Sequence, residues 1–241
     1  MKITVKYIES TDFVLLTISS FDEIPNKETI CELYCQNSQL TSLQGIENLT
    51  QLQILDCGGN RLSSLQGIEN LTQLHKLYCY GNKLTSLQGI ENLTQLQTLY
   101  CWYNQLTSLQ GIENLTQLQQ LYCHCNQLAS LQEIDNLTQL QGLFCSENQL
   151  TSLQGIENLT QLQRLYCENN QLTSLPNWLC FLPNLIDMRC DPEIPNSLQR
   201  ILDRHQIKNK HTIYNDGQNV HDSAVQQSFR KSLICLFNDT C

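Results

Sequence analysis

Residues 96–117 read LQTLYCWYNQLTSLQGIENLTQ, and this 22-residue stretch recurs along the chain with little change. LQILDCGGNRLSSLQGIENLTQ occupies residues 52–73, and LHKLYCYGNKLTSLQGIENLTQ occupies residues 74–95. A unit of this size is too small to bury its own apolar face, so successive copies must stack on one another. The repeat therefore predicts a solenoid.

Each copy carries the motif L-x-x-L-x-C-x-x-N-x-L. With cysteine at the usual third leucine position, the chain resembles the leucine-rich repeat family over residues 30–194. The resemblance implies an α/β-type solenoid in the form of a horseshoe or arc. Its short parallel strands would line the concave side, its convex side would be irregular or 3₁₀-helical, and both ends would be capped.

The residues themselves lead to the same arrangement. Leu99 and Cys101 alternate as the inward positions of a strand should. Leu109, Ile112 and Leu115 lie three residues apart, which is the spacing of a 3₁₀-like turn with one inward face. An asparagine follows each strand, and we expect its amide to satisfy buried backbone groups of neighbouring coils. These asparagines are Asn60, Asn82, Asn104, Asn126, Asn148 and Asn170.

Two shorter segments flank the repeats. Residues 1–29 contain ITVKYIE and FVLLTIS around a polar turn, which predicts a hairpin that covers the open end of the core. The last unit, LTSLPNWLCFLPNLIDMRC, departs from the 22-residue form and resembles L-x-x-L-P-x-x-L-x-x-L. We expect residues 195–241 to close the other end with two helices, one over SLQRILDRHQI and one starting near Asp222 or Ser223.

Several features favour a cytoplasmic protein. Charged residues interrupt the first 13 positions, where a signal peptide needs a continuous apolar stretch, and no run is long enough to span a bilayer. Thirteen cysteines, an odd number without an export signal, favour a reducing compartment. The segment IYNDGQNVHDSAVQQSFRKSL resembles segments that follow such repeats in giant DNA viruses of the mimivirus type. That resemblance implies a viral protein made in host cytoplasm.

The charge balance limits the partners. The chain has 14 basic and 23 acidic residues and a net charge of -9, which repels phosphate backbones and anionic membrane surfaces. We therefore expect no nucleic acid and no membrane partner. A regular file of acidic residues on the convex side fits a solvated surface that keeps the protein soluble. It comprises Glu47, Glu69, Glu91, Glu113, Asp135 and Glu157.

The cysteines of the motif recur at an inward position, so we expect a buried ladder of reduced thiols that act as small apolar side chains. A zinc site usually draws four ligands from C-x-x-C pairs, and the sequence has none, so we expect no metal and no cofactor. Alternation turns Cys125 away from the ladder. If His124 lowered its pKa, Cys125 would be a reactive thiol, although an incidental surface thiol is the simpler interpretation. The ladder is Cys35, Cys57, Cys79, Cys101, Cys123, Cys145 and Cys167.

Variation between the copies concentrates at the outward strand positions. The position before the cysteine is aromatic in six of eight coils, which fits either a ladder that stabilises the sheet or a binding surface. The position after the cysteine varies more widely, and a purely structural role would not need that diversity. Tyrosine and tryptophan dominate interface hot spots. The candidate partner-binding residues are Tyr78, Tyr80, Tyr100, Trp102, Tyr103, Tyr122 and His124.

Three classes of function fit these patterns to different degrees. No catalytic constellation appears at a fixed spacing, so we expect no enzyme and no catalytic residue. The leading hypothesis is a protein-protein interaction module that binds a protein partner, a host factor if the chain is viral, on its concave aromatic face. The alternative is a structural, self-associating viral repeat protein. A ubiquitin-ligase-type effector would need a catalytic Cys235 or Cys241, and the segment after Cys190 is too short for such a domain. The sequence leaves the partner and the oligomeric state open.

Overall fold

The computed structural model describes residues 1–191. The chain divides into two compact units, Met1–Ile207 and Lys208–Cys241, and all described residues belong to the first. The two helices expected within residues 195–241 lie outside the described part of the chain.

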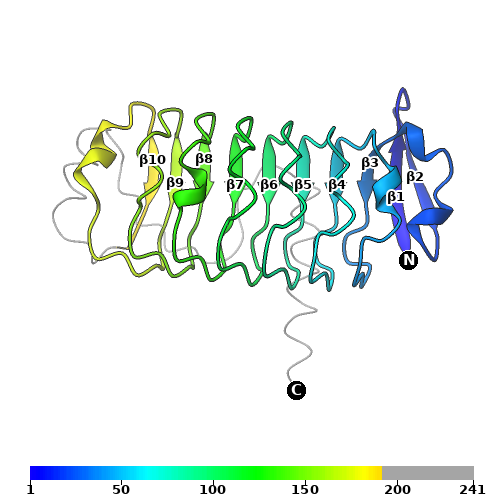
Figure 1. The fold of residues 1–241 in the computed structure, drawn as a ribbon, viewed down its shortest axis with the longest axis horizontal. Coiled ribbons are helices and arrows are strands. Elements are labelled where there is room, and N and C mark those ends of the chain that lie inside the picture. Colours follow the sequence, from blue (N-terminus) through cyan, green and yellow to red (C-terminus); the bar gives the residue numbers. More distant parts are fainter. Residues whose placement is uncertain (192–241) are drawn as a thin grey trace, which may run out of the picture. The chain divides into compact units, whose positions relative to one another are not determined.

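The described unit is built around a ten-stranded sheet in the order β10-β9-β8-β7-β6-β5-β4-β3-β1-β2 (Figure 1). Strands β3 to β10 run parallel, and each pairs with the strand of the next copy. The strands are β1 (Lys2–Tyr7), β2 (Phe13–Thr17), β3 (Ile30–Tyr34), β4 (Ile54–Asp56), β5 (Lys76–Tyr78), β6 (Thr98–Tyr100), β7 (Gln120–Tyr122), β8 (Gly142–Phe144), β9 (Arg164–Tyr166) and β10 (Asp187–Arg189).

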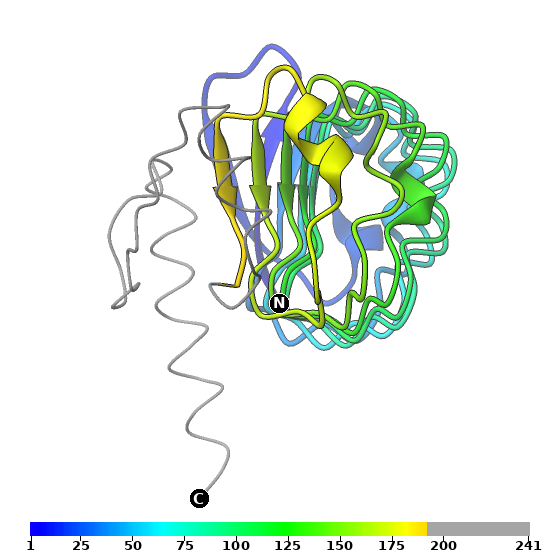
Figure 2. The same ribbon diagram turned by 90° about the vertical axis from the view of Figure 1, so that its left-hand side faces the viewer.

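The opposite wall of the solenoid consists of turns and short 3₁₀ segments, as the end-on view shows (Figure 2). Within one coil the N–H of Ile112 donates to the carbonyl of Leu109 at 3.3 Å, and the N–H of Leu115 donates to Ile112 at 2.9 Å. These bonds span three residues, so the wall has the predicted 3₁₀ character even where no full helical turn forms. The 3₁₀ helices are η1 (Phe21–Glu23), η2 (Lys27–Thr29), η3 (Ile46–Asn48), η4 (Gln132–Ile134) and η5 (Asn177–Phe181).

The core lies between the two walls and repeats from coil to coil. Leu99 and Cys101 from the strand side and Leu109, Ile112 and Leu115 from the opposite wall are all fully buried. The equivalent residues of the other copies join them in one continuous hydrophobic cluster. The parallel-strand solenoid predicted from the 22-residue period is therefore confirmed.

The N-terminal residues extend the sheet and cover the first coil. Strands β1 and β2 form an antiparallel hairpin, and β1 also pairs antiparallel with β3. Ile3 and Val5 of β1 point into the core, and Phe21 and Ile24 are buried beside them. The parallel solenoid thus begins against an antiparallel pair of strands.

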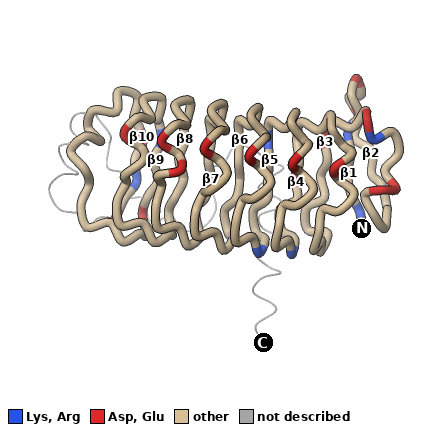
Figure 3. The backbone as a smooth tube through the Cα atoms, in the orientation of Figure 1, with Lys and Arg blue, Asp and Glu red and all other residues tan. Residues whose placement is uncertain are grey.

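The acidic file has a structural role that the sequence reading missed. The Glu91 carboxylate accepts a hydrogen bond from the N–H of Gly89 at 2.8 Å, and Gly89 adopts a φ of 106°. Because only glycine adopts this conformation readily, the carboxylate secures a turn that the glycine permits. The same bond joins Gly45 to Glu47, Gly67 to Glu69, Gly111 to Glu113 and Gly155 to Glu157. Acidic segments accordingly recur from coil to coil along the solenoid (Figure 3).

Candidate functional site

Outward side chains of the strands and of the residues just after them form two rows of rings on one side of the solenoid, which we call the aromatic face. The first row consists of the residues that precede each cysteine, and strand pairing places them in register. The rings of Tyr100 and Tyr122 lie 4.1 Å apart, and those of Tyr122 and Phe144 stack at 4.1 Å and 8°. Tyr78 and Tyr166 continue the row through edge-on contacts. One uninterrupted line of rings therefore crosses five strands.

The second row consists of the residues that follow each cysteine, and it is a parallel stack. The rings of Tyr80 and Trp102 lie 4.6 Å apart at an interplanar angle of 7°. Trp102 and His124 lie 5.3 Å apart at 9°. Tyr103 adds an edge-on contact to Trp102 at 5.4 Å. The structure thus brings all seven candidate residues of the sequence analysis together on adjacent coils.

Two of the candidate residues are buried, which corrects the expectation that all seven present exposed side chains. Tyr80 is 3% exposed and Trp102 is 8% exposed, because their flat sides face neighbours in the stack. A Cβ atom added to Gly58 would collide with the ring of Tyr80. Glycine at that position is therefore a packing requirement. Part of the variation that suggested binding has a structural cause.

Tyr103 is the most exposed of the candidate residues, and its backbone is unusual. Its side chain is 44% exposed, and its φ of 51° lies in the left-handed region. The equivalent position is Gly59 and Gly81 in the two preceding coils, as this conformation favours. Cys125 and Glu147 follow Tyr103 in the same conformation on the next two coils. Three consecutive coils thus place at this position a residue that does not readily adopt the left-handed conformation.

The aromatic face carries charge at both ends of its first row. Asp56 replaces an aromatic ring on β4 and is 8% exposed, and burial raises the pKa of its carboxyl to about 6. At the other end the Arg189 guanidinium lies 4.0 Å from the centre of the Tyr166 ring. Arg164 lies 5.9 Å from the ring of Phe144. A nonpolar centre is therefore bounded by an acid on one side and guanidinium groups on the other.

The suggestion that His124 activates Cys125 is wrong. Burial lowers the pKa of His124 to about 4, so its imidazole is neutral at pH 7. Burial and the Glu147 carboxylate raise the pKa of Cys125 to about 12, and its Sγ lies 3.3 Å from that carboxylate. A thiol that remains protonated at neutral pH is a poor nucleophile. Cys125 is thus an unreactive thiol in this setting.

The ladder cysteines are buried and show no disulfide among the residues described. Burial raises the pKa of Cys79 to about 12 and raises those of Cys57, Cys101, Cys123, Cys145 and Cys167 well above the ordinary value. Within residues 1–191 no cluster of three metal-binding side chains occurs. No helix in the same range is long and apolar enough to cross a membrane.

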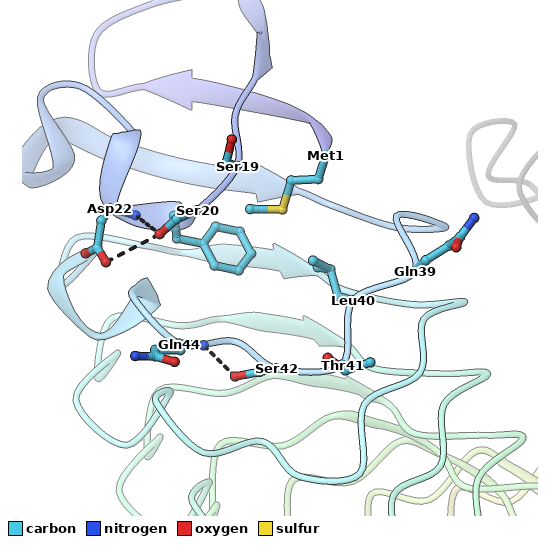
Figure 4. A pocket seen from close by; sticks show the side chains of 10 residues that line it. Met1, Ser19, Ser20, Asp22, Gln39, Leu40, Thr41, Ser42 and Gln44 are labelled. Atoms are coloured by element: carbon cyan, nitrogen blue, oxygen red, sulfur yellow. Dashed lines mark hydrogen bonds between the residues drawn. The ribbon is translucent and has the colours of Figure 1, made fainter.

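A hollow of about 390 Å³ lies away from the aromatic face, between residues 19–22 and residues 39–44 (Figure 4). Its lining consists mainly of hydroxyl and amide side chains. Ser20 Oγ accepts from the N–H of Asp22 at 3.1 Å, and Ser42 Oγ accepts from the N–H of Gln44 at 3.0 Å. These hydroxyls therefore hold turns. The lining includes no histidine, cysteine or lysine, and its carboxylate, Asp22, pairs with Lys27 at 3.2 Å.

Comparisons with known proteins agree with the fold. Residues 33–195 match the family model described as "Leucine-rich repeat region". A leucine-rich repeat protein of Leptospira interrogans is 32% identical with a TM-score of 0.68, over 73% of this chain and 48% of that one. An internalin, InlF, from Listeria monocytogenes is 25% identical with a TM-score of 0.51, over 74% of this chain and 63% of that one.

Internalin C2 from the same bacterium shares the fold, with 24% identity and a TM-score of 0.54 over 68% of this chain and 82% of that one. The chain thus spans about half of the Leptospira protein and under two thirds of InlF. No curated protein sequence is significantly similar to it.

Proposed function

Because the chain belongs to the leucine-rich repeat family, whose members generally act as protein-protein interaction modules, we propose that it is a non-enzymatic module that binds a protein partner on its aromatic face. This face is the sheet surface that the sequence analysis expected to be concave. The observation that carries the proposal is the pair of adjacent ring rows centred on Tyr100 and Trp102.

Tyr103 supports binding over a purely structural role. A residue other than glycine in the left-handed conformation costs about 1–2 kcal/mol. Tyr103 keeps this conformation beside Trp102, whereas the two preceding coils place glycine there. A ladder that served only stability would gain from glycine at residue 103 as well. Cys125 and Glu147 carry the same strain, so the support for a contact with a partner comes from the exposed ring of Tyr103, a side-chain type that dominates interface hot spots.

The chemistry of the face indicates what the partner presents. Tyrosine and tryptophan rings bury large areas and still offer hydrogen-bonding groups, so they suit apolar side chains with polar edges. Asp56 on β4 and Arg189 on β10 lie at the two ends of the row, so they orient a partner of opposite polarity across the strands. We propose a host protein as the partner, supported by the resemblance of the C-terminal segment to giant-virus proteins.

The test separates binding from stability through Tyr103→Gly. This substitution relieves the strained backbone and removes the exposed ring. The free energy of unfolding of the variant should therefore be close to that of the wild type or higher. We expect it to lose a specific protein from an affinity pull-down out of candidate host lysate, and to bind the purified protein at least tenfold more weakly, the effect of a hot-spot residue.

Phe181→Ala is the matched control, because Phe181 is 66% exposed on η5, away from the aromatic face. It should retain the captured protein. Equal capture by wild type and Tyr103→Gly, with the double variant Tyr80→Ala and Trp102→Ala also unchanged, would reject the aromatic face as the binding surface. That result would favour a structural role for the repeats.

A further inference from the structure

Strand β2 is an exposed apolar strand at the edge of the sheet. It is the last strand in the sheet order and pairs with β1 alone among the described strands. Phe13 is 52% exposed, Val14 is 38% exposed and Leu15 is 67% exposed. Apolar side chains on both faces of an edge strand are unusual in a protein that stays monomeric.

The hydrogen-bond pattern shows which backbone groups face outward. The N–H of Ile18 donates to the carbonyl of Met1 at 3.0 Å, and the Met1 amino group donates to the carbonyl of Ile18 at 2.6 Å. In an antiparallel pair such exchanging positions alternate with positions that do not bond across the pair. The N–H and C=O groups of Phe13, Leu15 and Thr17 therefore point away from β1.

The strand lacks the devices that normally protect such an edge. Natural edges carry a lysine or another charge, a proline or a bulge, any of which hinders the addition of another strand. The sequence FVLLT of β2 has no charged residue and no proline, and its pairing with β1 is regular along its length. It therefore offers an unblocked template for a further strand.

We propose that β2 is a self-association site where a second copy of this chain adds its own β2 antiparallel, which joins the two sheets. A two-fold axis at Leu15 places this residue opposite its counterpart and places Phe13 opposite Thr17. No like charges then face each other across the new pair, although each chain carries a net charge of -9. The outward groups of these three residues supply the donors and acceptors of the ladder.

A second copy fits better than a foreign strand because the side chains of β2 complement those of an antiparallel copy of β2. The central leucine contacts the central leucine, and the ring of Phe13 covers the smaller Thr17. Phe13 is also held in place, since its ring contacts Tyr34 at 5.7 Å and the Lys6 Nζ lies 5.4 Å from the ring centre. The site lies at the opposite end of the sheet from β10 and does not depend on binding at the aromatic face.

Sedimentation velocity of the full chain over a concentration series tests the proposal. We expect the wild type to show a concentration-dependent monomer-dimer equilibrium. Leu15→Lys should shift it to monomer, with the dissociation constant raised at least tenfold. Ile186→Lys is the matched control, because Ile186 is 66% exposed near β10, and it should dimerise as the wild type does.

A second variant tests the backbone ladder itself. Leu15→Pro removes an N–H that points outward and makes no bond to β1, so it should abolish the dimer while the melting temperature stays close to that of the wild type. A wild type that stays monomeric up to its solubility limit would overturn the proposal. So would a dimer that survives both Leu15 variants, or one that Ile186→Lys disrupts equally.

Discussion

The amide nitrogen of Asn104 lies 3.1 Å from the carbonyl oxygen of Cys79, so the asparagine of one coil binds the backbone just after the strand of the coil before it. The same nitrogen donates to Cys101 at 3.1 Å and to Trp102 at 3.3 Å, and Oδ1 accepts from the N–H of Leu84 at 3.0 Å. Each such asparagine therefore ties two coils together through buried backbone groups.

Replacement of Asn104 by alanine should lower the free energy of unfolding by about 1–3 kcal/mol, since buried donors and acceptors would be left without partners. Chemical denaturation measures this loss. Gln105→Ala changes an exposed neighbour and should alter stability by less than about 0.5 kcal/mol. Equal stability of the two variants would contradict the role assigned to the ladder.

Alanine should be tolerated much less at Gly155 than at Gly89, although both have a φ of 106°. A Cβ on Gly89 would lie 3.5 Å or more from its nearest neighbours, whereas one on Gly155 would collide with the backbone of Leu131. Both variants carry the strain of a left-handed alanine. Because of overpacking, Gly155→Ala should lower the free energy of unfolding by about 1–3 kcal/mol more than Gly89→Ala does. Matched denaturation curves that give equal losses would show that the preceding coil can move aside.

Asp56 should make stability depend on pH. Its folded pKa of about 6 exceeds the ordinary aspartate value of 3.8, so the folded protein holds the proton more tightly and becomes less stable as pH rises from about 4 to above 6. Asp56→Asn keeps an acceptor for the N–H of Gly58, which lies 3.0 Å from Oδ1. The free energy of unfolding of the variant should therefore exceed that of the wild type by about 1–3 kcal/mol at pH 8, and the two should differ little at pH 4. A difference that does not change with pH would refute the assignment.

Alkylation of the folded protein, followed by peptide mass spectrometry, should distinguish the buried cysteines from Cys125 by their rates of reaction. Cys101 is fully buried and should react only when the protein unfolds. Cys125 should react slowly at pH 8, and its rate should rise about tenfold per pH unit up to pH 10 without a plateau, because its pKa is about 12. A plateau between pH 8 and 9 would show instead that Cys125 has an ordinary thiol.

The interior of the solenoid was predictable because it depends only on the repeat. Every copy places leucine, isoleucine and cysteine at the same inward positions, and stacking is the only way to bury them. The outer face was less predictable. The sequence indicated that Tyr80 and Trp102 leave the core, yet their burial follows from parallel stacking between neighbouring coils. A local motif carries no information on the tilt of a ring toward the next copy.

The sequence by itself determined the period, the inward residues and the asparagine ladder, because each of these is a local pattern written in every copy. Only the tertiary structure decided that Glu91 binds the turn at Gly89, that burial keeps Cys125 protonated, and that β2 leaves its apolar edge open. These features depend on distances between groups that the motif does not specify. They arise where one coil meets its neighbour or where the stack of coils ends.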